Sequence, residues 1–161
     1  MKFGFPVKNV LLTQADAVPA VAGPFTAGDG WQAGSTEFAL QVPGVGEFYA
    51  HEGLEIIYSI EARADPDWVN LYLNNQVLVA LLHQRKIISF HASSFILDGR
   101  GVMILGETGA GKTSLTVAFA INGAGFMSDD LTPVVFRENV PHIWSLDRRV
   151  KLRADSIEQL E

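Results

Sequence analysis

The chain has 161 residues, of which 48% are apolar, and this is enough for a folded domain with a buried core. Its 18 acidic residues outnumber its 12 basic residues, and the net charge of −6 provides no general attraction for nucleic acid. There is no cysteine, which excludes disulfides, thiolate metal sites and cysteine nucleophiles and is compatible with a reducing compartment.

No segment has the length or composition of a membrane span or a signal peptide. The longest apolar run, Val77–Leu82, is far shorter than the roughly 20 residues that cross a bilayer. The apolar stretch Val10–Leu12 is too short for a signal-peptide core. The only basic cluster is interpreted as a solvated face; it consists of Arg148, Arg149, Lys151 and Arg153. We therefore expect a cytoplasmic protein that binds neither membranes nor nucleic acid.

Residues 1–64 have the pattern of a small β-rich region. Strand-like segments at Phe38–Val42, Glu47–Ala50 and Leu54–Ile60 are separated by turns that contain glycine or proline. Residues 15–34 are rich in alanine, glycine and proline without clear periodicity, and we expect them to form a loop.

A helix is predicted from Asp65 to about Arg85, at the start of a second region, residues 65–161. The sequence Asp65-Pro66-Asp67 combines a capping acid, a proline at the first helical position and an acid near the positive end of the helix dipole. Apolar side chains then recur near helical spacing, which is typical of a core-facing stripe. They are Trp68, Leu71, Tyr72, Val79 and Leu82.

Two strands are predicted after this helix. Ile87–Leu97 is rich in β-forming residues, and a turn at Asp98-Gly99 leads into the short apolar run Gly101–Leu105. Hairpin geometry would lay the two strands side by side and bring His91 close to the segment that follows. Without that geometry, a lone histidine in a strand is more often a hydrogen-bonded core residue than a catalyst.

The next segment is a glycine-rich loop with the spacing G-x-x-x-x-G-K-T, from Gly106 to Thr113. This is the pattern of a phosphate-binding P-loop, or Walker A motif. Backbone N–H groups of such a loop surround phosphate oxygens, the lysine places a positive charge on the β- and γ-phosphates, and the threonine hydroxyl ligates Mg²⁺. A predicted strand precedes the loop and a predicted helix to Ile121 follows it, which is the order that the motif requires.

A second acidic element follows the helix. Asn122-Gly123 ends the helix, and the apolar strand that begins at Gly125 ends in the adjacent carboxylates Asp129 and Asp130. Acids at the end of a strand beside a phosphate loop hold Mg²⁺ or orient the nucleophile in phosphoryl-transfer sites. Adjacent side chains in a strand point to opposite faces, so the two acids are not expected to share one role unless the chain bends there.

The run from His91 through the glycine-rich loop to Asp130 resembles the catalytic core of HPr kinase/phosphorylase and the HPr-kinase-like serine kinases. That family has a His-Gly or His-Ala pair, a hairpin, a P-loop, a helix that ends at glycine and a strand that ends in Asp-Asp. The resemblance implies an α/β fold, a P-loop-containing HPr-kinase-like core with a small N-terminal β-rich region. The family core continues beyond the point where this chain ends, so the core is expected to be incomplete at its C-terminus.

The resemblance also implies a role for each matching residue. ATP phosphates would be bound by Gly106, Glu107, Thr108, Gly109, Ala110, Gly111, Lys112, Thr113 and Ser114. The catalytic residues would be Asp129 as the proton acceptor, His91 beside it, and Lys112 on the transferring phosphate. Mg²⁺ would be held by Thr113 and Asp130.

The leading hypothesis is therefore an ATP-dependent kinase that transfers the γ-phosphate to a serine hydroxyl of a protein or peptide, HPr-like or other. One alternative is a nucleotide-binding module that regulates or assembles without transferring phosphate. A further alternative is an incomplete fold whose sheet edge is completed by a second copy of the chain in a homo-oligomer. All three hypotheses stay open at the level of the sequence.

Overall fold

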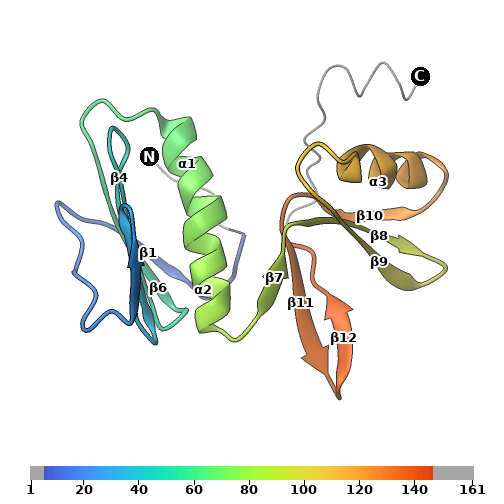
Figure 1. Ribbon diagram of the computed structural model, residues 1–161, viewed down its shortest axis with the longest axis horizontal. Helices are drawn as coiled ribbons and strands as arrows, with labels where there is room; N and C mark the ends of the chain where they lie inside the picture. Colours follow the sequence, from blue (N-terminus) through green and yellow to red (C-terminus); the bar gives the residue numbers. More distant parts are fainter. Residues whose placement is uncertain (1–5, 147–161) are drawn as a thin grey trace. The chain divides into compact units, whose positions relative to one another are not determined.

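The computed structural model describes residues 6–146, so the basic cluster at 148–153 lies outside the described part. The described residues form two compact units, which divide between residues 87 and 88. The second unit begins later than residue 65, because the helix predicted from Asp65 packs on the sheet of the first unit (Figure 1). No helix in the described part of the chain is long and apolar enough to cross a membrane.

The first unit is a six-stranded sheet with one helix on it. The strand order is β1-β6-β5-β4-β3-β2, and every neighbouring pair is antiparallel except the parallel pair β1 and β6. The strands are β1 (Leu11–Gln14), β2 (Thr26–Gly28), β3 (Trp31–Ala33), β4 (Glu37–Val42), β5 (Gly46–His51) and β6 (Glu55–Ile60). Strands β2 and β3 lie in the segment that was expected to be a loop, since three-residue strands are too short to show periodicity.

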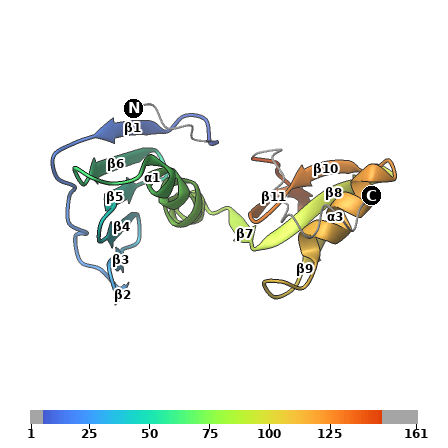
Figure 2. The ribbon, with the colours of Figure 1, turned by 90° about the horizontal axis from the view of Figure 1, so that it is seen from above.

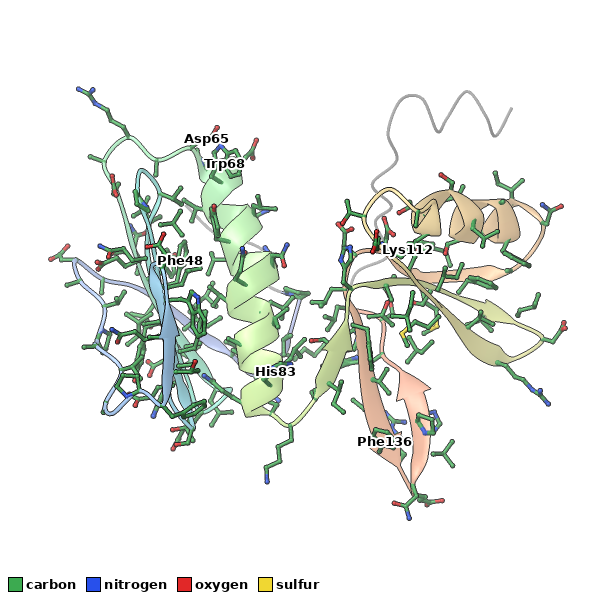
Figure 3. All side chains as sticks on the ribbon, viewed as in Figure 1. Phe48, Asp65, Trp68, His83, Lys112 and Phe136 are labelled. Carbon is green, nitrogen blue, oxygen red and sulfur yellow. The ribbon has the colours of Figure 1, made fainter. Side chains whose placement is uncertain are left out.

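The helix consists of α1 (Pro66–Tyr72), a π-helical turn (Leu73–Val77) and α2 (Leu78–Gln84). It begins as predicted, because the Asp65 carboxylate accepts a hydrogen bond from the Asp67 backbone N–H at 2.9 Å. Its buried face packs on β5 and β4, and buried side chains of β6 lie opposite those of β5 in the core of the unit (Figure 3). This core includes Phe48, Ala50, Ile56, Tyr58, Val69, Leu73, Val77, Leu78, Leu81 and Leu82.

The second unit contains two three-stranded antiparallel sheets, ordered β10-β8-β9 and β12-β11-β7. Their strands are β7 (Ile88–Phe90), β8 (Ala92–Leu97), β9 (Arg100–Leu105), β10 (Gly125–Ser128), β11 (Thr132–Arg137) and β12 (Val140–Ile143). Helix α3 (Lys112–Ile121) lies along the first sheet (Figure 2), where the Phe119 ring stacks on that of Phe95 with centroids 4.6 Å apart.

The predicted hairpin is confirmed, but the predicted α/β P-loop core is wrong. Strands β8 and β9 pair from Ala92 opposite Leu105 to Leu97 opposite Arg100. Across residues 6–146 the protein is mostly β-structure in three sheets, with one helix of 19 residues and the shorter α3. The reason is that β9 pairs with its own hairpin partner, and a short apolar run looks the same in an antiparallel sheet as in the parallel sheet that was expected.

Candidate functional site

The expected proximity of the glycine-rich loop and the two adjacent acids does not depend on the overall fold class. Strands β9 and β10 flank β8, and because each is antiparallel to β8 they run parallel to each other. Their carboxyl ends therefore lie at the same edge of the sheet. The glycine-rich loop leaves this edge from β9, and the two acids follow β10 at the same edge. The topology thus brings residues 106–113 close to residues 129 and 130.

The loop between β9 and α3 depends on glycine for its conformation. Gly109 and Gly111 have φ angles of 86° and 82°, in the left-handed region that other residues adopt at a cost. A Cβ atom at either position would meet no atom within 4 Å, so the requirement comes from the backbone and not from lack of space. Residues 106–111 are all exposed. The loop is therefore an open turn that a ligand can approach.

Helix α3 begins directly after the loop and leaves backbone donors facing it. The N-cap residue is Gly111, which provides no side-chain cap. The first N–H groups of any α-helix have no acceptor within the helix, and they carry the positive end of its dipole. Here these donors belong to Lys112, Thr113 and Ser114, the last residues of the predicted phosphate-binding set. Their position suits an anion such as a phosphate group.

The Lys112 ammonium folds over the loop (Figure 3). Its Nζ atom donates to the backbone carbonyls of Gly106 at 2.9 Å and Glu107 at 3.0 Å. An ammonium group has three N–H donors, so one remains for an acceptor outside the loop. These contacts keep the positive charge of Lys112 beside the first two residues of the loop.

Thr113 is hydrogen bonded to Asp129, across 16 positions of the sequence. The Thr113 hydroxyl donates to Oδ1 of Asp129 at 2.8 Å. The other carboxylate oxygen, Oδ2, is buried and has no hydrogen-bond partner among residues 6–146. A buried polar atom without a partner costs free energy, so Oδ2 is a position where a cation would be stabilising.

Asp130 and His91 form the other side of the acidic turn. Asp130 has a φ angle of 69°, so the chain bends between the two acids and their side chains need not alternate as in a strand. The Nδ1 atom of His91 lies 3.1 Å from the backbone carbonyl oxygen of Asp130. Since a carbonyl only accepts, Nδ1 carries the proton in this contact. His91 is exposed.

The structure brings some of the predicted site residues into contact and leaves others apart. Asp129, expected as the proton acceptor, touches Thr113, which was expected on the metal. Asp130, expected on the metal, contacts His91 through its backbone. The remaining predicted residues, Glu107, Thr108, Ala110 and Ser114, lie in the loop and in the first turn of α3.

Sequence reasoning missed a group of buried hydroxyls behind the acidic turn. Ser93, Ser94, Ser128 and Thr132 are each at most 2% exposed, and they come from β8, β10 and β11. A signal was available, because Ser93-Ser94 interrupts an otherwise apolar strand and Ser128 immediately precedes the acids. Buried hydroxyls require hydrogen-bond partners, and such clusters specify local geometry.

The described residues contain no group of three or more histidine, aspartate or glutamate side chains that could hold a metal by themselves. This does not conflict with Mg²⁺, which commonly takes only one or two protein ligands and completes its shell with water and substrate phosphates. Comparison of the chain with protein-family models, with curated proteins and with solved structures finds no match. The chemistry of the site follows from its own residues and their geometry.

Proposed function

We propose that the loop from Gly106 to Thr113 binds the phosphates of ATP together with Mg²⁺. The observation that carries the proposal is the hydrogen bond of 2.8 Å from the Thr113 hydroxyl to Asp129 Oδ1. A hydroxyl has one proton, so a threonine that donates to Asp129 keeps its lone pairs available for a cation. The bond therefore orients Thr113 as a magnesium ligand.

The residues present fit the cation. Asp129 Oδ2 is a buried oxygen without a partner in the described part of the chain, next to the hydroxyl that would ligate the metal. We assign Mg²⁺ to Thr113 and Asp129, and not to the pair Thr113 and Asp130 that the resemblance implied, because Asp129 is the acid hydrogen bonded to Thr113. The backbone N–H groups and Lys112 would hold the phosphates. When bound, Mg²⁺ neutralises charge on the phosphate oxygens and polarises them.

The reaction that this site serves is phosphoryl transfer to a serine hydroxyl of a protein or peptide, as in the HPr-kinase-like kinases that the sequence resembles. The serine oxygen forms a bond to the γ-phosphorus, and the bond from that phosphorus to the β,γ-bridging oxygen breaks. The serine proton goes to Asp129 Oδ1, the carboxylate oxygen that is not assigned to the cation, which has a second lone pair beside its hydrogen bond from Thr113. Such transfer depends on alignment and charge neutralisation more than on covalent help. We assign the activity to the cytoplasm, where ATP and Mg²⁺ are available.

Binding is tested by isothermal titration calorimetry with ATP, with and without Mg²⁺. We expect Lys112→Ala to weaken binding at least about tenfold, because a charged contact to phosphate is lost. Lys8→Ala is the matched control, since Lys8 is an exposed lysine of the first unit. Unchanged affinity in Lys112→Ala, or no binding of ATP by the unsubstituted protein, would contradict the proposal.

Transfer is tested separately, by incorporation of labelled phosphate into serine-containing peptides. We expect Asp129→Asn to abolish incorporation and to lose the gain in ATP affinity that Mg²⁺ provides. Asp98→Asn is the control, because Asp98 lies at the tip of the β8–β9 hairpin with a φ angle of 50° that asparagine also tolerates. Binding without transfer would instead support the nucleotide-binding module that regulates or assembles.

A further inference from the structure

The buried hydroxyls of the second unit form a connected chain beside the acidic turn. Ser94 Oγ lies 2.6 Å from Ser128 Oγ, and Ser128 Oγ lies 2.9 Å from Thr132 Oγ1. Thr132 Oγ1 also lies 2.9 Å from the backbone carbonyl oxygen of Ala92. The three hydroxyl residues are at most 2% exposed. The chain thus joins β8, β10 and the first residue of β11.

The direction of each hydrogen bond follows from the number of protons. The carbonyl of Ala92 can only accept, so Thr132 uses its single hydroxyl proton there. Thr132 must then accept from Ser128, and Ser128 must accept from Ser94. The contact between Thr132 and Ser94 is longer, at 3.4 Å, and is not required by this order. Hydrogen bonds aligned in this way strengthen one another, and Thr132 is the residue that ends the chain.

The hydroxyl chain lies on both sides of the turn that carries Asp129. Ser128 immediately precedes Asp129, and Thr132 follows three residues later. Between them the turn is closed by a hydrogen bond from the Leu131 N–H to the Asp129 carbonyl at 2.9 Å. The pairing of β10 with β8 also shifts register between Phe126 and Ser128, so strand pairing alone does not fix this end of β10.

We propose that Thr132 is a positioning residue of the nucleotide site, which fixes Ser128 and so presents the Asp129 carboxylate to Thr113 and to the cation. This inference rests on the proposed binding of ATP with Mg²⁺. Thr132 itself touches neither phosphate nor metal. Among the described residues, Thr132 makes no hydrogen bond to residues 106–114, so its effect is expected in the acidic half of the site. Loss of the Thr132 hydroxyl should therefore reduce the gain in ATP affinity that Mg²⁺ provides, and it should leave the affinity measured without Mg²⁺ intact.

The test is calorimetric measurement of ATP affinity in the full chain, with Mg²⁺ and with a chelator in its place. In Thr132→Val we expect the gain in affinity from Mg²⁺ to fall about tenfold, as for other residues that orient metal ligands. Affinity without Mg²⁺ should stay within about twofold, and Thr132→Ser should restore the gain because it keeps the hydroxyl. Ser93→Ala is the matched control, since Ser93 is equally buried but its hydroxyl makes only a contact of 3.5 Å to the Ser128 carbonyl within the described part of the chain.

If Thr132→Val does not fold, Ser128→Ala gives the same test, because it removes the middle of the hydroxyl chain with little change of volume. An unchanged gain from Mg²⁺, or an equal loss of affinity with and without Mg²⁺, would overturn the positioning role in either variant. If the unsubstituted protein binds ATP with no gain from Mg²⁺, the cation half of the proposed function fails and the positioning role fails with it. If the unsubstituted protein binds ATP more tightly with Mg²⁺ and Thr132→Val keeps that gain in affinity, only the positioning role fails.

Discussion

Replacement of Thr113 by valine tests the central contact of the site without any ligand. Valine keeps the shape of threonine but removes the donor to Asp129 Oδ1, which the structure places at 2.8 Å. Hydrogen bonds to charged groups contribute about 1.5–3 kcal/mol to stability, and we take the lower end because Asp129 is only partly buried. A loss of about 1.4 kcal/mol corresponds to a tenfold change in an equilibrium constant.

The assay is native-state hydrogen exchange of the full chain, read on the amides of α3 and β10. Exchange reports local stability, so the first unit does not obscure the result. We expect protection in α3 and β10 to fall about tenfold in Thr113→Val and to stay near its original level in Thr113→Ser, which keeps the donor.

Thr116→Val is the matched control on the same helix. Thr116 is fully buried, and its hydroxyl has no hydrogen-bond partner among the described residues. Removal of an unsatisfied hydroxyl should be neutral or stabilising, so protection should be unchanged or higher. If Thr113→Val and Thr116→Val lower protection equally, the contact between Thr113 and Asp129 does not stabilise the site and the reasoning is refuted.

Two further predictions concern the first unit and a comparison between glycines. Gly46→Ala should unfold this unit, because the added Cβ atom would lie 2.1 Å from the Ser59 carbonyl oxygen, and circular dichroism would show the loss of structure. In Gly111→Ala the added Cβ atom would meet no atom within 4 Å, so backbone strain should lower the free energy of unfolding by only about 1–2 kcal/mol. Equal effects would contradict this steric reasoning. Tyr49→Phe should make the free energy of unfolding depend less on pH in the acid range. The Tyr49 hydroxyl donates to Glu37 and holds the pKa of that carboxyl below its ordinary value of 4.5, so the stabilisation is present above that value and is lost as the pH falls through the lowered pKa. Urea titrations from pH 3 to 7 measure this, and equal slopes in both proteins would contradict it.

The sequence by itself determined local features of both units, including the start of the candidate site. The cap at Asp65, the hairpin at Asp98-Gly99 and the start of α3 after the glycine-rich loop all appear where local signals predicted them. Each depends on residues that are close in the chain, such as an acid before proline or glycines with positive φ angles. Such signals act over a few residues and can be read without knowledge of the fold.

Tertiary structure decided the features that depend on distant pairings. In the second unit β10 pairs antiparallel with β8, on the side opposite β9, and no local pattern states that β10 becomes the neighbour of β8. The same arrangement decided that Asp129 contacts Thr113 and that Ser94, Ser128 and Thr132 meet in one buried chain. The physical reason is that a side chain finds its partner only after non-local strands have paired, and that pairing depends on burial of both faces and not on the residues of one strand.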